Sequence, residues 1–163
     1  MTDGGARDRV LERAAVRAGD TVLHVPAGSD SLTFAALGLA GDGWVIAVAR
    51  SVLRLEELLR AAHEAGAPGI QYLLGDPDVL PLPDASVDVV VGRGVLDGAA
   101  DPAGAADELH RVLRSGGRVS VAEPLSGTAD LGDLFRDAGF EGVQVVAADD
   151  CEPGLALVAA RRP

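Results

Sequence analysis

Short apolar runs alternate with helical patterns along most of this chain. Five of the runs are five residues long and rich in valine, isoleucine and leucine. They are residues 21–25, 44–48, 70–74, 87–91 and 118–122. Runs of this kind are typical of strands that are buried on both faces, and helical segments separate most of them. We therefore expect an α/β fold in which a mostly parallel sheet lies between two layers of helices.

The predicted helices carry apolar residues at the spacing i, i+3, i+4 and i+7, which places them on one face. Two such faces are formed by Leu55, Leu58, Leu59 and Ala62 and by Leu131, Leu134, Phe135 and Ala138, the second closed by Gly139 as a C-cap. The first helix is expected over about Asp8–Ala18, where it leads into the first strand.

Capping residues predict where two further helices begin. Asp101 stands before Pro102, which suits the first position of a helix, and Asp107 precedes Arg111 by four residues. We expect Asp101 to cap this helix and Asp107 to pair with Arg111. In the same way, we expect Asp30 to cap the helix that follows the first strand.

The carboxyl-terminal pattern differs from the rest. Two strand-like runs, Val143–Ala147 and Leu155–Ala160, are joined by seven residues without a helical pattern. This connection predicts an antiparallel pair at the end of the sheet. Because no linker or internal repeat interrupts the pattern, we predict a single domain over residues 1–163.

Composition excludes several classes of function. All 14 basic residues are arginine, so a lysine-containing phosphate loop and Schiff-base chemistry are excluded. The formal net charge of −11 opposes binding to nucleic acid or to an anionic membrane. The single Cys151 cannot form an intrachain disulfide or a cysteine-rich zinc site, and no metal site is predicted. With no export signal in the first residues, we expect a cytoplasmic protein.

Two segments of the chain resemble the class I S-adenosylmethionine-dependent methyltransferases. The first is GDPDVLPLPDASVDVVV, from Gly75 to Val91, and the second is ELHRVLRSGGR, from Glu108 to Arg118. The resemblance extends over about residues 10–161. It implies a Rossmann-like three-layer sandwich whose seven strands lie in the order 3-2-1-4-5-7-6, the last pair antiparallel. It also implies S-adenosylmethionine as the cofactor of a small-molecule methyltransferase.

The loop after the first strand departs from the cofactor motif of that family, which reads acid-x-Gly-x-Gly-x-Gly. His24 replaces the acidic residue, and Pro26 and Asp30 replace the outer glycines, while Gly28 is retained. The resemblance places His24, Ala27 and Gly28 in the cofactor site. We interpret His24 as a residue that fills a disused pocket, with ligand binding by its imidazole as the alternative.

The end of the second strand shows another departure. The family carries there an acidic residue that accepts hydrogen bonds from the ribose, but this chain has Ala49 followed by Arg50. An arginine at this place can bind the 2′-phosphate of NADP, although the glycine pattern for a pyrophosphate is missing. Asp76 is retained beside Pro77, and the resemblance places both of these residues and Gly92 at the cofactor. Each lost charge-assisted hydrogen bond is worth roughly 1.5–3 kcal/mol, so we expect weak or no binding of S-adenosylmethionine.

Two charged residues follow the fourth strand at the same edge. Arg93 and Asp97 are the candidate catalytic residues that would orient a substrate, and solvated loop charges are the alternative interpretation. The fifth strand leads almost directly into the next helix, so most of the family's substrate lid is missing and we expect an open cleft. A second copy of the chain or another protein would be needed to cover it.

Three functions are consistent with these patterns. The one we favour is a methyltransferase-like protein with a degenerate cofactor site and a binding, assembly or non-methylating role. The second is an active small-molecule methyltransferase that uses Asp76, Gly28 and backbone amides. The third is a partner subunit that completes another enzyme. The expected partners are therefore a small molecule or a protein.

Overall fold

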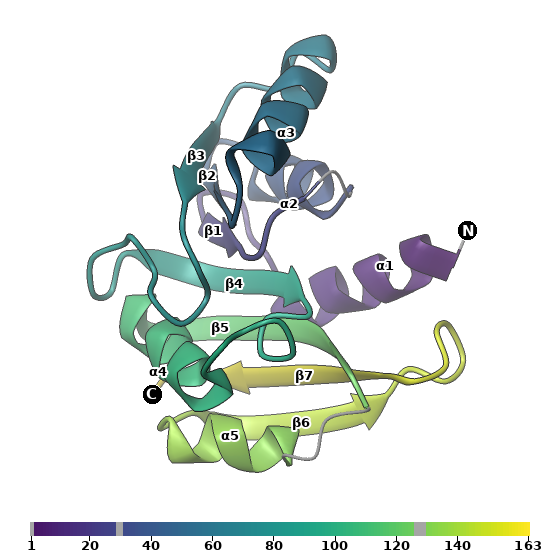
Figure 1. Ribbon diagram of the computed structural model, residues 1–163, viewed down its shortest axis with the longest axis vertical. Coiled ribbons are helices and arrows are strands. Elements are labelled where there is room, and N and C mark those ends of the chain that lie inside the picture. The colour runs from purple at the N-terminus through teal and green to yellow at the C-terminus, as the bar shows by residue number, and fades with distance from the viewer. Residues whose placement is uncertain (1, 29–30, 126–129) are drawn as a thin grey trace.

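The computed structural model describes residues 2–28, 31–125 and 130–163, which form five helices and seven strands (Figure 1). In chain order the elements are α1 (Thr2–Ala14), β1 (Thr21–His24), α2 (Leu32–Ala40), β2 (Trp44–Ala49), α3 (Val52–Glu64), β3 (Ile70–Leu74), β4 (Val87–Arg93), α4 (Pro102–Val112), β5 (Leu113–Pro124), α5 (Leu131–Asp137), β6 (Glu141–Ala147) and β7 (Leu155–Arg161). No helix in the described ranges is long and apolar enough to cross a membrane.

The strands form one sheet in the order β3-β2-β1-β4-β5-β7-β6. The first five strands in this order form four parallel pairs, and β7 is antiparallel to both β5 and β6. The predicted strand order and the antiparallel end are therefore confirmed. The central parallel strands are mainly apolar because helices or packed loops cover both of their faces.

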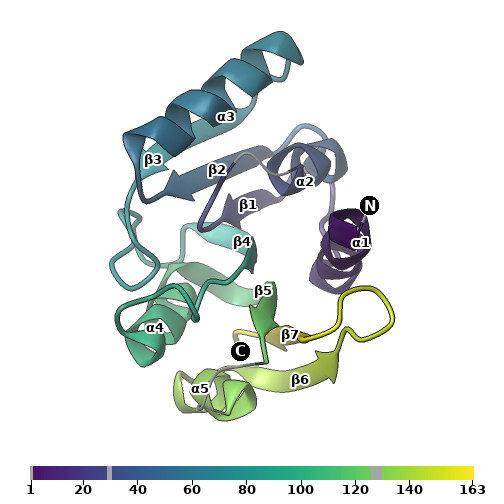
Figure 2. The same ribbon diagram turned by 45° about the vertical axis from the view of Figure 1, so that its right-hand side comes forward.

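Helices lie on the two faces of this sheet, as Figure 2 shows. Helices α1, α2 and α3 pack on one face, and α4 and α5 pack on the other. Between β3 and β4 no helix forms, and the segment 75–86 crosses the α4 face as turns, with Leu80 buried in the core. Consecutive strand residues alternate between the two faces, so Val22 packs beside α1 and α2 while Leu23 packs on the α4 side.

Two predicted helices differ from the observed ones. Helix α1 begins at Thr2 and ends at Ala14, whereas Asp8–Ala18 was predicted. It ends before Ala18 because Ala15 has a φ of 49° and Arg118 donates to the carbonyls of Ala14 and Ala15. Leu59 was predicted to face the core, but it is 54% exposed. Helix α3 lies over the edge of the sheet, where the core takes only Leu58 and Ala62 fully.

The structure confirms one predicted helix cap and changes the partner of one predicted ion pair. The side chain of Asp101 accepts from the backbone N–H of Gly104, so this cap is confirmed. Gly139 follows the C-cap of α5, which is Ala138, and has a φ of 99°. Arg111 pairs with Glu108 and with a residue of the segment 75–86 instead of the predicted Asp107. The predicted cap Asp30 and residues 126–129 lie outside the described residues.

Candidate functional site

The predicted site residues gather at the carboxyl ends of β1, β2, β3 and β4, which lie at one edge of the sheet. The loop after β1 is anchored by two backbone hydrogen bonds, from Val25 to the carbonyl of Val91 and from Ala27 to that of Val48. A Cβ atom built on Gly92 would stand 2.1 Å from the carbonyl oxygen of Val25, so only glycine fits there. Such edges bind ligands in open α/β sheets.

His24 is fully buried at the end of β1. Its Nδ1 lies 2.6 Å from the hydroxyl oxygen of Thr33, a buried residue of α2. The imidazole thus joins strand and helix, and it is not exposed to a ligand. This placement agrees with the interpretation of His24 as a residue that fills the pocket.

Gly28 keeps the property that a cofactor loop requires. A Cβ atom built on it would meet no atom within 4 Å, so its backbone faces open space among the described residues. Ala27 beside it is buried. The backbone at Gly28 therefore remains accessible to a ligand. His24 and Ala49, however, stand where the family carries acidic residues.

Arg50 extends from the end of β2 across the neighbouring strand ends. Its Nε lies 3.5 Å from Oδ1 of Asp76, which follows β3. A Cβ atom built on Gly98 would stand 2.9 Å from both terminal nitrogens of Arg50, so the guanidinium rests on the loop after β4. Ala49 and Pro77 are buried next to this pair. The Arg50 side chain therefore lies among residues that the resemblance places at the cofactor.

Arg93, at the end of β4, forms a bidentate ion pair with Glu152 of the β6–β7 loop. One of its two bonds, from a terminal nitrogen to Oε2, is 2.9 Å long. Arg9 of α1 pairs with Asp150 of the same loop. Figures 1 and 2 show this yellow loop beside α1. Two ion pairs therefore tie the loop to α1 and to β4.

Cys151 lies in this loop next to Glu152, and its Cβ atom would stand 2.9 Å from a Cβ atom built on Gly5 of α1. The β6–β7 loop therefore approaches α1 closely at this end of the sheet. The open cleft that the sequence predicts stays a prediction.

Glu123, at the end of β5, is a residue that the sequence analysis did not select. Its fully buried carboxylate accepts from the backbone N–H groups of Val95, Leu96 and Asp97 at 2.7–3.1 Å. Burial raises the pKa of Glu123, and the three N–H donors act against this rise. The side chain of Asp97 is exposed. An acidic residue directly after an apolar strand, at the edge where the other candidates lie, was the signal for Glu123.

One cavity lies at this edge, between α1 and the ends of β4 and β5. Its volume is about 20 Å³. A pocket for a drug-sized ligand measures roughly 300–1,000 Å³, and one water needs roughly 10–15 Å³. The cavity therefore holds a water molecule or one small chemical group. It is lined by Ala6, Arg7, Val10, Ser31, Leu32, Gly92, Arg93 and Ala122.

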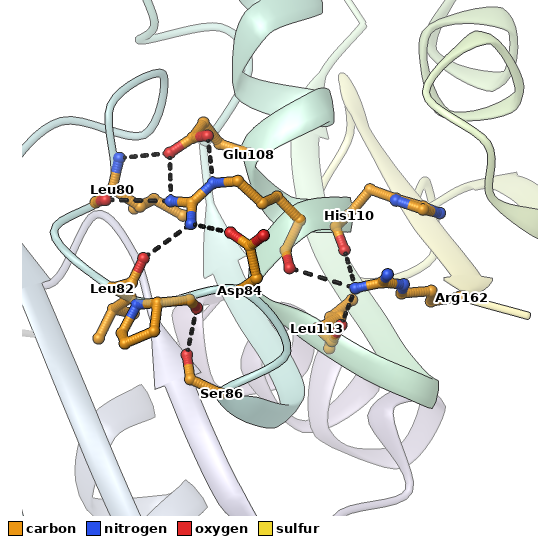
Figure 3. Close-up of polar contacts among 10 residues, drawn as sticks. Leu80, Leu82, Asp84, Ser86, Glu108, His110, Leu113 and Arg162 are labelled. Carbon is orange, nitrogen blue, oxygen red and sulfur yellow. Dashed lines mark hydrogen bonds and ion pairs between the residues drawn. The ribbon is translucent and has the colours of Figure 1, made fainter.

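The two segments that carry the family resemblance contact each other through Arg111 (Figure 3). Its guanidinium donates to the carboxylate of Glu108 at 2.7 and 2.8 Å, to Asp84 at 2.8 Å, and to the carbonyls of Leu80 and Leu82. Glu108 in turn accepts from the N–H of Leu80. Arg111 lowers the pKa of Glu108. These residues fasten the segment 75–86 to α4, so this part of the two motifs has a structural role.

The residues at the edge fit S-adenosylmethionine poorly. A guanidinium carries only donors, so Arg50 cannot accept hydrogen bonds from ribose hydroxyls as a carboxylate does. The imidazole of His24 is buried against Thr33, and the cavity at the β4 end is far smaller than a cofactor. The backbone at Gly28 and the carboxylate of Asp76 are the elements that would suit it.

Comparisons with known proteins agree with the fold and with the resemblance. A family model described as a methyltransferase domain matches residues 23–121. The arsenite methyltransferase of Halobacterium salinarum is 28% identical, over 84% of this chain and 41% of its own. A ubiquinone/menaquinone biosynthesis C-methyltransferase of a Ruegeria species is 31% identical, over 79% of this chain and 54% of its own. The chain thus spans about half the length of these relatives.

Among solved structures, an S-adenosylmethionine-dependent methyltransferase from Aquifex aeolicus shares the fold. Its TM-score is 0.82 at 21% identity, with 96% of this chain and 89% of that chain covered. At this identity the likeness shows a common architecture and carries no activity with it.

Proposed function

Because the chain belongs to the class I S-adenosylmethionine-dependent methyltransferase family, we propose that it is a member whose cofactor site is filled by its own side chains. In this proposal it serves as a binding or assembly protein and does not transfer methyl groups. The observation that carries the proposal is the position of Arg50, whose guanidinium lies between Asp76 and Gly98.

The missing carboxylate at position 49, more than the displacement of Arg50, explains why the cofactor would bind weakly. The pair of Arg50 and Asp76 is exposed, with 37% and 64% of the side chains accessible, so it contributes at most about 1 kcal/mol. A cofactor could displace Arg50 at that cost. It would then meet Ala49 in place of a carboxylate and would lose two charge-assisted hydrogen bonds, each worth roughly 1.5–3 kcal/mol. The free energy of these two hydrogen bonds is larger than that of the ion pair, so their loss sets the expected affinity for the cofactor.

The second candidate is a working methyltransferase with an unusual cofactor loop. The accessible backbone at Gly28 favours it, because backbone amides bind anionic groups whatever the side chains are. The weakness of the Arg50–Asp76 pair favours it as well. The two candidates differ in one measurable property, the affinity for S-adenosylmethionine.

Calorimetric titration of the protein with S-adenosylmethionine and with its demethylated product separates them. We expect no binding in the low-micromolar range, and no adenosyl compound that copurifies with the protein by mass spectrometry. The double variant Ala49→Asp with Arg50→Ala should bind about 100-fold more tightly, since about 3 kcal/mol of hydrogen bonding returns. Arg54→Ala, which removes an exposed arginine one turn into α3, is the control and should change nothing.

A second variant covers the loop after β1. The quadruple change His24→Asp, Pro26→Gly, Asp30→Gly and Ala49→Asp restores the family motif at each departed position. Circular dichroism establishes that each variant is folded before it is titrated. Low-micromolar binding by the unaltered protein would overturn the proposal and leave the working methyltransferase.

A further inference from the structure

The small cavity between α1 and the ends of β4 and β5 has an apolar floor and a cationic rim. Ala6, Val10, Leu32 and Ala122 are each at most 4% exposed, and they form the floor together with Gly92. Arg7, Arg93 and Ser31 complete the lining. None of the described residues that line the cavity is acidic, although the chain carries a net charge of −11.

Each of the two arginines has polar partners beside the cavity. Arg7 donates to the hydroxyl of Ser31 at 2.8 Å and pairs with Asp8 at 2.9 Å. Arg93 pairs with Glu152, which reaches it from the β6–β7 loop. The contacts with Ser31 and Asp8 fix the guanidinium of Arg7, so an anion that takes the place of Glu152 on Arg93 would find a second, preorganised arginine beside it.

The ion pair of Arg93 with Glu152 shows which chemical group suits this place. The two terminal nitrogens of the guanidinium each meet one oxygen of the carboxylate, which is the fork-to-fork geometry that arginine offers to carboxylates. The side chains are 40% and 23% exposed, so the contact can exchange with solvent. Glu152 therefore occupies a carboxylate position that another carboxylate can take.

We propose that this cavity binds a short aliphatic carboxylic acid, whose carboxylate replaces that of Glu152 on Arg93 and whose apolar end enters the cavity. The volume of about 20 Å³ admits one small group, so the acid is limited to a short chain or to the propionate-like end of a larger molecule. Neutral analogues would break the ion pair without replacing its charge, and cations would meet two arginines. The inference rests on the proposed binding function, because it names a ligand class for it.

Glu152 acts as an internal competitor, which sets the size of the expected effect. A partly exposed ion pair of about 1 kcal/mol favours the state in which Arg93 is paired with Glu152 over the unpaired state by a factor of about five. The apparent dissociation constant of the acid is then about fivefold above its intrinsic value. Removing the carboxylate of Glu152 should therefore lower the apparent dissociation constant of the acid about fivefold.

The test is a titration of the complete, isotope-labelled protein with sodium propionate, followed by amide NMR at constant ionic strength. We expect saturable shifts at the amides of Gly92 and Arg93, and about fivefold tighter binding by Glu152→Gln. The matched control is Asp150→Asn, which makes the same change of charge in the same loop but lies on Arg9, and it should bind as the unaltered protein does. Propionamide, the neutral analogue, should cause no saturable shift.

Several outcomes would overturn the inference. They are equal affinity in Glu152→Gln and Asp150→Asn, an equal response to propionamide, or unchanged binding after Arg93→Gln in a variant whose spectrum shows a folded protein. A parallel titration with S-adenosylmethionine reports at the amides of Gly28 and Asp76 instead. Failure of the carboxylate site and failure of the proposed function are therefore seen at different residues.

Discussion

Replacing Arg111 by methionine should weaken the attachment of the segment 75–86 to α4 without detaching it. Methionine keeps an unbranched apolar stem of similar length, so the change removes the guanidinium and leaves most of the side-chain packing. Arg111 donates five hydrogen bonds, to Glu108, Asp84 and the carbonyls of Leu80 and Leu82 (Figure 3). All of these are lost together in the variant.

The expected loss of stability follows from the surroundings of each acceptor. Asp84 is 79% exposed, so its ion pair with Arg111 contributes close to nothing. The bidentate pair with Glu108, whose side chain is 20% exposed, contributes about 1–2 kcal/mol. The carbonyls of Leu80 and Leu82 lose a donor at about 0.5–1 kcal/mol each. The free energy of unfolding should therefore fall by about 2–4 kcal/mol.

Urea unfolding followed by far-ultraviolet circular dichroism measures this difference. The slope against urea concentration should stay the same, because the folded state keeps its size. The thermal midpoint should fall by about 4–16 °C, at about 2–4 °C for each kcal/mol. The control is Arg136→Met, which removes an arginine from an exposed pair with Asp133 in α5 and should cost less than about 0.5 kcal/mol.

Equal stability of the Arg111 and Arg136 variants would refute this reasoning. The apolar contacts of buried Leu80 would then hold the segment 75–86 by themselves. The polar contacts of Arg111 would in that case have no part in fastening the segment to α4.

Three further predictions concern stability. Glu108 has a lowered pKa, so its contribution is complete above pH 4.5 and is lost as the pH falls below that value; Glu108→Gln should make the acid-induced loss of stability shallower in urea titrations at several pH values. Glu123→Ala leaves three N–H groups without their acceptor and should lower the unfolding free energy by about 3–5 kcal/mol, whereas a loss below about 1 kcal/mol would show that water replaces the carboxylate. Gly92→Ala should unfold at a lower temperature than the unaltered protein, because its Cβ would stand 2.1 Å from a carbonyl oxygen; Gly38→Ala, in α2 with open space around it, should be stabilised by about 0.5–1 kcal/mol, and a melting curve that ranks the two variants the other way would contradict this explanation.

The strands and their order were predictable because the signal for them is local and repeated. Each apolar run becomes a strand within a few residues of its predicted limits, and the missing helix before Leu155 indicates the antiparallel end. The limits of α1 were not predictable. The carboxyl end of this helix depends on Arg118, which lies about a hundred residues away in the sequence. No pattern of residues within the helix itself indicates this contact.

The sequence by itself determined the family, the strand order and the positions at which the cofactor motif is altered, because these depend on residue identity and spacing along the chain. Only the tertiary structure decided what the altered residues do. Arg50 pairs with Asp76 from the neighbouring strand end, Glu152 reaches Arg93 from a distant hairpin, and Glu123 holds the loop after β4. Each of these contacts joins segments far apart in the sequence. Their partners are therefore set by how the sheet and helices pack, which no periodicity within a segment encodes.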